Sequence, residues 1–555
     1  MRVVISPLKR FFRNLRLFAV MFFIVGAGVT LLSNFYNLQI KKGSFYSAKA
    51  QSRYRLSGYL NTIRGSIYLT DKNGNEIPAA INKTSPVIYA VPKEIEDVDE
   101  ASNMIAELLG KSVDEVKLLL GKENDLYEVL VRKADPEQIL KIADAAIKGV
   151  YIEDEESRFY PFNNLGAHFL GFVGAGDDDM ETGRYGLESF YNKKLSGIPG
   201  KIEENKIEKS TPGENIQLTI DRNIQARAEE ILKNVVETYR AVAGTVIVED
   251  PKTGAVLAMG SYPDFDPNNY SKSSIKTFLN PAGQAVYEPG SIVKVLTMAA
   301  ALDAGSVTPK TTFYDSGSLV LSGKTIKNWD LKAHGTITMT EVIEQSINTG
   351  AAFAERKLGH DNFREYMIKF GLSDKTGIDL PGELAGNLRN LASGAKEINF
   401  ATASFGQGIS LTPLELISAF SVLGNGGVLM RPYLNENLGP QMVRRVVSEH
   451  AAREVTQMMV SAVNKAKVAE IPEYNIAGKT GTAQVPDFKK GGYTDDVINT
   501  YAGYAPAYDP RFVILIKIEK PEGAPLAGAT VVPAFRELAQ FILNYYNIPP
   551  DRKSN

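Results

Sequence analysis

The sequence predicts a protein of mixed α and β structure, divided into two or three domains behind an N-terminal membrane segment. The chain has 555 residues, and a single hydrophobic core stops growing at about 250 to 300 residues. Strand patterns and amphipathic helix patterns alternate from about residue 215 onwards. The third observation is an uncharged apolar stretch close to the N-terminus.

The composition excludes several classes of function. The net charge is −2, so there is no basic excess and no nucleic acid partner is expected. The chain contains no cysteine, which excludes disulfides, thiolate catalysis and cysteine zinc sites. No H-E-x-x-H motif occurs around the histidines. We therefore expect no metal and no cofactor.

The N-terminal region predicts an uncleaved membrane anchor. Several basic residues in segment 1–16 precede the stretch from Leu17 to Tyr36, which carries no charge. A stretch of about 20 apolar residues is long enough to span a bilayer, whereas a cleaved signal peptide has an apolar part of roughly 7 to 15 residues. The basic residues predict a cytoplasmic N-terminus, with the chain beyond the anchor outside the membrane.

Beyond the anchor, the pattern of predicted strands and helices changes near residue 215. Residues 38–214 contain short alternating runs, a charged helical segment and glycine-rich connections, without a catalytic pattern. The segment "TPGENIQLTIDRNIQARAEEILKNVVETYR" then predicts a turn, a strand and a long amphipathic helix, and "AGTVIVEDPKTGAVLAMGSY" predicts two strands joined by a turn. A second domain is therefore predicted to begin here.

The segment "YEPGSIVKV" places Ser291 three residues before Lys294, after a Pro-Gly turn. The apolar run that follows ends at Gly305 and has the start and stop signals of a helix. Positions three apart share a helix face, so the Lys294 amine can reach the Ser291 hydroxyl. Taken alone, the motif is more typical of a capped helix with a lysine extended to solvent. Buried beside a second cation, however, the lysine would be a neutral base for the serine.

Two further motifs follow along the chain. Ser346 and Asn348 lie two residues apart between two helical patterns, where both can point into one cleft. Taken alone, they are better explained by an ordinary capping turn. In "NIAGKTGTAQV", Lys479, Thr480 and Gly481 lie in a segment typical of a strand. Glycine inside a strand predicts that a ligand backbone approaches closely. Each motif is weak by itself.

The ordered set S-x-x-K, S-x-N and K-T-G resembles the class B penicillin-binding proteins, and the chain is most similar to the division-specific peptidoglycan transpeptidases. The resemblance covers essentially residues 17 to 545. It extends to segments outside the motifs, including "RGSIYLTDKNGNEI", "GRYGLESFYNKKLSGIPG", "TGIDLPGE", "ATASFGQGISLTPLELISAF" and "YAGYAPAYDPRFVILIKIEKP".

The resemblance implies an α/β fold of the penicillin-binding and serine β-lactamase type, with an antiparallel sheet covered by helices. An α+β pedestal, or dimerisation-like, domain and one transmembrane helix precede it. The implied division is a cytoplasmic tail at 1–16, a signal-anchor at 17–37, the pedestal at 38–214, the transpeptidase domain at 215–548 and a tail at 549–555.

The resemblance also implies a mechanism. Ser291 attacks the penultimate D-alanine of a stem peptide with Lys294 as its base, and an amine of a neighbouring stem resolves the acyl-enzyme. The backbone N–H groups of Ser291 and Thr482 form the oxyanion hole. Ser346 relays a proton to the leaving amine and Asn348 binds the substrate amide. The terminal carboxylate is bound by the third motif, which comprises Lys479, Thr480, Gly481 and Thr482.

By the same resemblance, the protein crosses the bacterial cytoplasmic membrane once. Its expected partners are stem peptides on lipid-linked or nascent glycan, β-lactams, a SEDS-family glycan polymerase and other membrane proteins of the division machinery. Three alternatives stay open: an elongation-type class B transpeptidase, a membrane-anchored β-lactamase or β-lactam sensor, and an inactive scaffold.

Overall fold

The computed structural model describes residues 21–28, 36, 62–122, 127–176, 181–203, 206–487, 489–524 and 526–552. Its contacts divide the chain into one unit of Met1–Ile63 with Gly197–Gly213 and another of Arg64–Ser196 with Glu214–Asn555. Of the predicted membrane anchor, residues 21–28 are helical, and the others, apart from Tyr36, lie outside the described ranges. Within those ranges, no helix combines the length and apolar character that crossing a membrane requires.

The first unit contains a small antiparallel hairpin, formed by β7 (Lys201–Glu203) and β8 (Lys206–Glu208). Ile198 and Thr211 exchange two main-chain hydrogen bonds of 2.9 and 2.8 Å. These bonds join the chain segment that enters the hairpin to the segment that leaves it.

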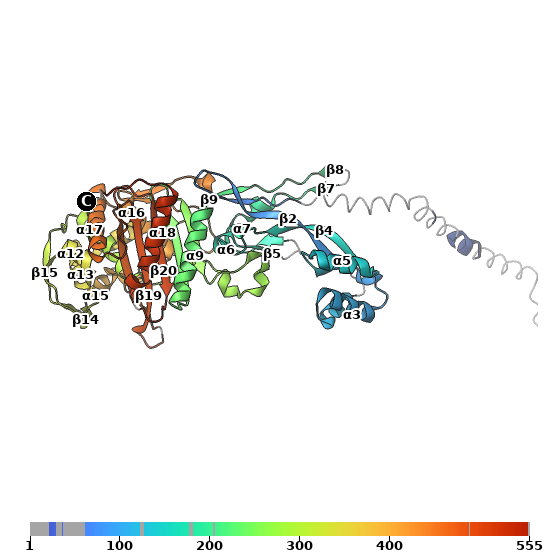
Figure 1. The fold of residues 1–555 in the computed structure, drawn as a ribbon, viewed down its shortest axis with the longest axis horizontal. Helices are drawn as coiled ribbons and strands as arrows, with labels where there is room; N and C mark the ends of the chain where they lie inside the picture. The colour runs from blue at the N-terminus through green and yellow to red at the C-terminus, as the bar shows by residue number, and fades with distance from the viewer. Residues whose placement is uncertain are drawn as a thin grey trace, which may run out of the picture. The chain divides into compact units, whose positions relative to one another are not determined.

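The N-terminal part of the second unit is built on a five-stranded sheet (Figure 1). Its strands are β1 (Ile67–Thr70), β2 (Ile77–Ala90), β3 (Glu128–Val131), β4 (Val150–Phe159) and β9 (Ile216–Asp221). β2 pairs antiparallel with β1, β3 and β4, and β1 pairs parallel with β9. The predicted strand near residue 216 is therefore confirmed, and it lies in this sheet; the predicted domain boundary at 214 and 215 stays a prediction.

Short helices and hairpins complete this part of the unit. The helices are α3 (Val98–Leu109), α4 (Val113–Leu120), α5 (Pro136–Ala145), α6 (Ala167–Leu170), α7 (Gly186–Phe190) and α8 (Asn192–Ser196). β5 (Val173–Ala175) pairs with β6 (Glu181–Gly183). The predicted charged helical segment is thus two helices, because Gly110 adopts a left-handed conformation and ends α3.

A second sheet has the strand order β11-β10-β20-β19-β18, and all its neighbours are antiparallel. The strands are β10 (Ala243–Glu249), β11 (Val256–Tyr262), β18 (Ala477–Pro486), β19 (Tyr493–Ala505) and β20 (Phe512–Glu519). The predicted pair of strands around the "DPKTG" turn is confirmed as β10 and β11. β18, which carries the third motif, is an edge strand.

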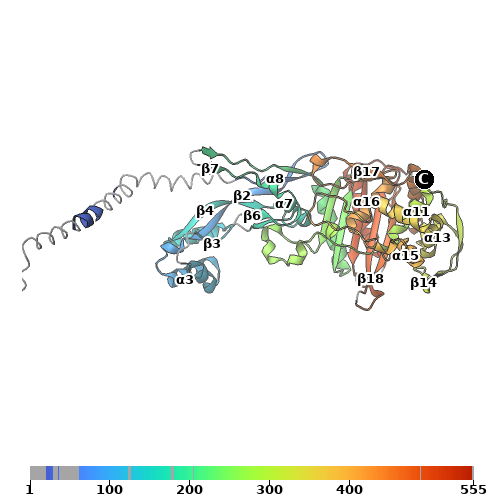
Figure 2. The ribbon, with the colours of Figure 1, turned by 180° about the vertical axis from the view of Figure 1, so that it is seen from behind.

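Helices cover both faces of this sheet (Figures 1 and 2). Alternate residues of β20 divide between two cores: Ile514 and Ile516 pack with α9 (Arg222–Thr238) and α18 (Val531–Tyr545), whereas Val513 and Leu515 face the other side. The cover of that other side includes α11 (Val293–Asp303), α16 (Pro413–Gly424) and α17 (Glu449–Ala466). The predicted long helix after residue 221 and the predicted terminal helix are confirmed as α9 and α18.

The remaining helices and strands surround α11. The helices are α10 (Pro281–Gln284), α12 (Met339–Gln345), α13 (Asn348–Leu358), α14 (His360–Lys369) and α15 (Glu397–Ala403). The hairpin strands are β12 (Thr312–Asp315) with β15 (Gly335–Thr338), β13 (Ser318–Leu321) with β14 (Lys324–Lys327), and β16 (Val428–Met430) with β17 (Met442–Arg445). α11 is largely apolar, and all its residues from Val293 to Leu302 are buried, Lys294 among them.

A buried ion-pair network stabilises the N-terminal part of the second unit. Glu188 is fully buried and accepts hydrogen bonds from Arg64 Nε at 2.7 Å and from Arg158 Nε at 2.6 Å. Arg64 lies just before β1, Arg158 lies in β4 and Glu188 lies in α7, so this one carboxylate joins three segments.

We expect Glu188→Gln to lower the free energy of unfolding by about 3 to 5 kcal/mol, because the two arginines would lose their counter-charge in a buried setting. The matched control is Glu155→Gln, since Glu155 pairs with Arg132 at the surface and such pairs contribute at most about 1 kcal/mol. Urea unfolding of both variants measures the difference. If both variants lost the same free energy of unfolding, burial would not explain the contribution of Glu188.

Candidate active site

Ser291 lies in the 3₁₀ turn η5 (Gly290–Ile292), which leads directly into α11. The α-helical part begins two residues later than the sequence predicts, because the first turn has the tighter 3₁₀ geometry. Gly290 has a φ of 62°, and a Cβ at this position would lie 3.2 Å from the Thr482 carbonyl oxygen. Glycine therefore allows the turn before Ser291 to approach β18 closely.

Lys294 is buried, with 1% of its surface exposed. Its amine donates to the Ser346 carbonyl oxygen at 2.5 Å and lies 3.2 Å from Ser346 Oγ. The sequence predicted a contact with Ser291. The amine instead hydrogen-bonds to Ser346, because the turn that carries Ser346 faces the same side of α11.

Ser346 is the C-cap of α12 and has a φ of 58°, in the left-handed region that few residues other than glycine adopt. This conformation ends α12 and turns the chain into α13 two residues later. Both the carbonyl and the hydroxyl of Ser346 bond to buried lysines. The predicted loop between two helices is confirmed, and Ser346 in this loop lies at the centre of the site.

Lys479 reaches the same hydroxyl from the sheet. It lies in β18, is 4% exposed, and its amine is 2.9 Å from Ser346 Oγ. The amine also donates to the carbonyl and hydroxyl oxygens of Thr480, at 3.2 and 3.3 Å. Ser346 Oγ is therefore the point at which the first and third motifs meet.

The electrostatics of the site follow from two amines buried among neutral oxygens. Burial lowers the pKa of Lys294 well below its ordinary value, and the charge of Lys479 lowers it further. Burial also lowers the pKa of Lys479, to about 7. Each charge disfavours the other, so protonation of one lysine favours the neutral form of its partner.

Gly481 lies in close contact with the turn that carries Ser291. A Cβ at this position would lie 2.6 Å from the Pro289 carbonyl oxygen and 3.1 Å from Ile292 Cγ1. The chain's own turn around Ser291 therefore approaches this strand closely, and the predicted approach of a ligand backbone stays a prediction. This contact places η5 directly against β18.

The structure places the other predicted residues as follows. Thr482 pairs with Asn499 in β19, and its hydroxyl accepts from the Ala527 N–H at 3.3 Å, in the 3₁₀ turn η8 (Ala527–Ala529). Asn348 is the first residue of α13, and its Nδ2 donates to the Lys327 carbonyl oxygen at 2.8 Å. Among the contacts of the described residues, the Asn348 side-chain amide does not bond to Ser346, Lys294 or Lys479.

One neighbouring residue was missed by sequence reasoning. Trp329 is 58% exposed, and its Nε1 donates to the Gln345 carbonyl oxygen at 2.9 Å, directly before Ser346. The available signal was its rarity, because it is the sole tryptophan of the chain. It forms an exposed aromatic surface beside the S-x-N motif.

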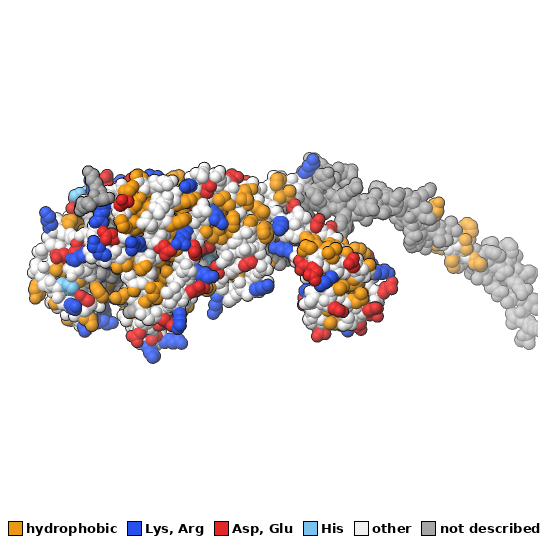
Figure 3. All heavy atoms as spheres, in the orientation of Figure 1, with side chains coloured by type: hydrophobic (Ala, Val, Ile, Leu, Met, Phe, Trp, Pro, Cys, Tyr) orange, Lys and Arg blue, Asp and Glu red, His pale blue; other side chains and the backbone are white. Residues whose placement is uncertain are grey.

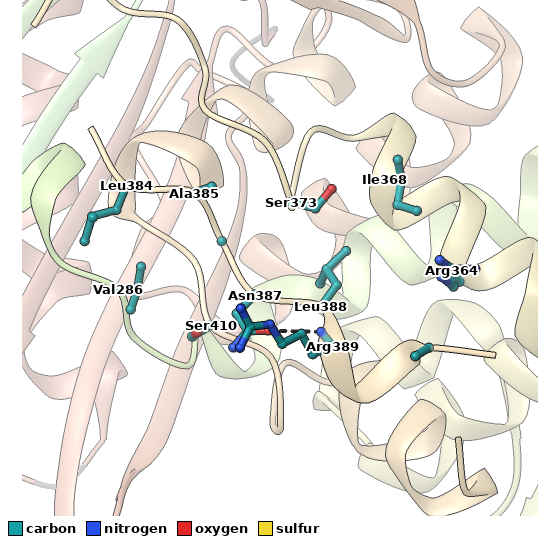
Figure 4. A pocket seen from close by; sticks show the side chains of 12 residues that line it. Val286, Arg364, Ile368, Ser373, Leu384, Ala385, Asn387, Leu388, Arg389 and Ser410 are labelled. Carbon is teal, nitrogen blue, oxygen red and sulfur yellow. Dashed lines mark hydrogen bonds between the residues drawn. The ribbon is translucent and has the colours of Figure 1, made fainter. Parts of the chain in front are cut away.

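A hollow of about 740 Å³ lies apart from these residues (Figure 4). Its lining includes Val286, Arg364, Ile368, Leu384, Leu388 and Arg389. None of the residues predicted for catalysis lines it. The candidate active site is therefore assigned from its hydrogen bonds and not from the size of this hollow.

Comparisons with known proteins identify the family of this chain. The family described as penicillin binding protein transpeptidase domain matches residues 244–540, and the penicillin-binding protein dimerisation domain matches residues 59–225. Stage V sporulation protein D of Bacillus subtilis is 32% identical over 84% of this chain and 76% of its own length. Peptidoglycan D,D-transpeptidase FtsI of Escherichia coli is 30% identical over 93% of this chain and 88% of its own length.

The fold is also that of a solved relative. The structure of penicillin-binding protein 3 from Mycobacterium tuberculosis, complexed with aztreonam, has a TM-score of 0.69 and 26% identity over 88% of this chain and 98% of its own. The predicted transpeptidase fold with a preceding dimerisation domain is confirmed. On the family match and on these relatives, the chain belongs to the class B penicillin-binding proteins.

Proposed function

We propose that this protein is a peptidoglycan D,D-transpeptidase that cross-links stem peptides through an acyl-enzyme on Ser291. The observation that carries the proposal is the chain of hydrogen bonds from Lys294 through Ser346 to Lys479, beside the turn that holds Ser291. The Escherichia coli relative is named a peptidoglycan D,D-transpeptidase, which supports the reaction class.

In the first half-reaction, the neutral Lys294 amine takes the proton of the Ser291 hydroxyl while its oxygen attacks the penultimate D-alanine carbonyl. Burial and the charge of Lys479 lower the pKa of Lys294, which favours that neutral amine. When the tetrahedral intermediate collapses, the C–N bond breaks and the terminal D-alanine leaves. Its amine receives a proton through Ser346 Oγ, which lies 3.2 Å from the Lys294 amine.

The oxyanion is stabilised by the backbone N–H groups of Ser291 and Thr482, and such donors contribute about 3 to 4 kcal/mol each. The contact between Gly481 and Pro289 supports this assignment, because it brings the two chain segments together. An amine from a second stem peptide then attacks the ester, which forms the cross-link and restores Ser291.

Substrate binding adjusts the protonation of the two lysines. Lys479, Thr480, Gly481 and Thr482 form the strand along which the terminal carboxylate binds. A carboxylate beside Lys479 favours its protonated form and so keeps Lys294 neutral. Asn348 binds the substrate amide through its side-chain oxygen Oδ1, while its Nδ2 continues to donate to the Lys327 carbonyl oxygen.

We further propose a role in septal wall synthesis, with residues 17–37 as a single membrane anchor and the transpeptidase domain at 215–548 outside the membrane. Segments 38–214 contain no catalytic pattern, so a SEDS-family polymerase is the expected source of glycan strands. Elongation of the lateral wall is the alternative role.

The acyl-enzyme gives the direct test of the proposed chemistry. Full-length protein in detergent, incubated with fluorescent penicillin, should carry one covalent adduct on Ser291 and release it over many minutes, because a transpeptidase keeps water from its ester. Ser291→Ala is the control and should remain unlabelled. Intact-mass spectrometry without an adduct would contradict the proposal, and rapid hydrolysis of penicillin would indicate a β-lactamase.

Replacing the buried base should separate activity from stability. Lys294→Met keeps the length and packing of the side chain but removes the amine, so penicillin acylation should fall by about 10²- to 10⁴-fold. Because the folded pKa of Lys294 is lowered, the unfolded chain binds more protons, and the buried amine destabilises the fold. The thermal midpoint of the variant should therefore rise, by an amount that decreases as the pH approaches 10.5.

The control for this variant is Lys517→Met. Lys517 is equally buried, but its amine pairs with Glu519 at 2.6 Å. Its removal should therefore lower the thermal midpoint, because Glu519 would lose its partner. A Lys294→Met protein that acylates at the parental rate would exclude Lys294 as the base.

The proposed topology predicts that protease added to intact spheroplasts digests everything beyond the anchor, because the positively charged N-terminus stays inside. A fluorescent fusion should gather at the division site. Protection of the transpeptidase domain would refute the topology, and a dispersed fusion would favour the elongation role.

A further inference from the structure

Glu288 lies three residues before Ser291 and has no part in the mechanism above. Its Oε1 accepts the Gly408 N–H at 3.0 Å, and its Oε2 accepts the Tyr493 hydroxyl at 3.0 Å. This carboxylate therefore connects three segments: the turn before Ser291, the loop at residues 406–411 and the start of β19.

The first two segments form a rigid pair. Tyr287 and Leu411 exchange two main-chain hydrogen bonds of 2.9 Å, and the Gly290 N–H donates to the Gly406 carbonyl oxygen at 3.1 Å. A Cβ on Gly406 would lie 2.1 Å from the Gly290 carbonyl oxygen, so the two backbones are in direct contact. The turn that carries Ser291 is thus fixed on this side.

The third segment is joined to Glu288 through the Tyr493 side chain. Tyr493 pairs with Pro486 where β18 and β19 extend into a hairpin, which projects from the sheet in Figure 1. Figure 3 shows charged side chains at its end, where Lys489 and Lys490 are exposed. Within the hairpin, Gln484 Nε2 donates to the Thr494 carbonyl oxygen. A bond of this kind joins the two strands to each other but does not join the hairpin to the turn before Ser291.

We propose that Glu288 is a positioning residue, which sets the separation of the Ser291 and Thr482 N–H donors by tying the β18–β19 hairpin to the turn before Ser291. The inference rests on the proposed function and deepens it. Thr482 lies on β18, four residues before Pro486, whose partner Tyr493 is held by Glu288. A tie at this point limits how far β18 moves away from the catalytic turn.

The function of the tie follows from the geometry that an oxyanion hole requires. Its donors act on the charge that develops during acylation, so they must be in place before the reaction. Misplacement of reacting groups by about 1 Å can cost 10²-fold in rate. Loss of the tie should therefore slow the acylation step without weakening the initial binding of the β-lactam.

A double-mutant cycle tests this inference in the full-length protein. Glu288→Ala, Tyr493→Phe and the double variant are reacted with benzylpenicillin in stopped-flow experiments, which separate the acylation rate constant from the dissociation constant. Each single variant should acylate about 10- to 100-fold more slowly, with the dissociation constant changed less than about twofold. The double variant should be no slower than Glu288→Ala, because both changes break the same tie.

The matched control is Tyr262→Phe, which removes another tyrosine–glutamate hydrogen bond of 2.9 Å, to Glu237 on α9. It should acylate at the parental rate. Tyr493→Phe removes one hydroxyl at the surface, so the inference stays testable even if Glu288→Ala unfolds.

Several outcomes would overturn the positioning role. Parental acylation rates in the variants, with only a lower thermal midpoint, would reduce Glu288 to a structural contact. Additive losses in the double variant would show that the two residues act independently. Failure of the parent protein itself to acylate at Ser291 would overturn the proposed function and this inference together, which distinguishes it from failure in the variants alone.

Discussion

The Ser346 hydroxyl between two buried amines is the interaction on which the rest of the catalytic domain depends. Lys294 comes from the central helix and Lys479 from the edge of the sheet, and both lie within 3.2 Å of this one oxygen. Among the described residues, the hydrogen-bond partners of both amines are carbonyl and hydroxyl oxygens of Ser346 and Thr480, and none is a carboxylate. The fold therefore holds two buried amines whose charged forms are disfavoured by burial, and the surrounding helices and sheet must offset the cost of burying them.

That burial also links substrate recognition with nucleophile activation. One lysine is suited to bind a carboxylate and the other to accept a proton, and the charge on the first favours the neutral form of the second. A single hydroxyl between them provides a path for the proton. In the proposed mechanism, the same residues thus perform two tasks that in many enzymes are divided between separate groups.

The sequence predicted most of the elements that carry Ser291, Lys294 and Lys479, because motif order and periodicity are local properties. It did not predict that Lys294 bonds to Ser346, since the left-handed conformation at residue 346 depends on how α12 and α13 pack. Nor did it predict the contact between Gly481 and Pro289, because the two residues are distant in sequence. Glu288 was visible in "YEPGS" but had no pattern that connected it to Tyr493, 205 residues away.

The place of β18 at the end of its sheet has a further consequence. An edge strand leaves a row of backbone N–H and C=O groups unpaired, and a protein usually protects such a row from other chains. Here the row borders the catalytic turn, so an extended peptide lying along it would complete the sheet as its next strand. Recognition of that kind reads the course of the main chain more than the identity of side chains. The free edge of β18 would then select a peptide by its backbone geometry and chirality.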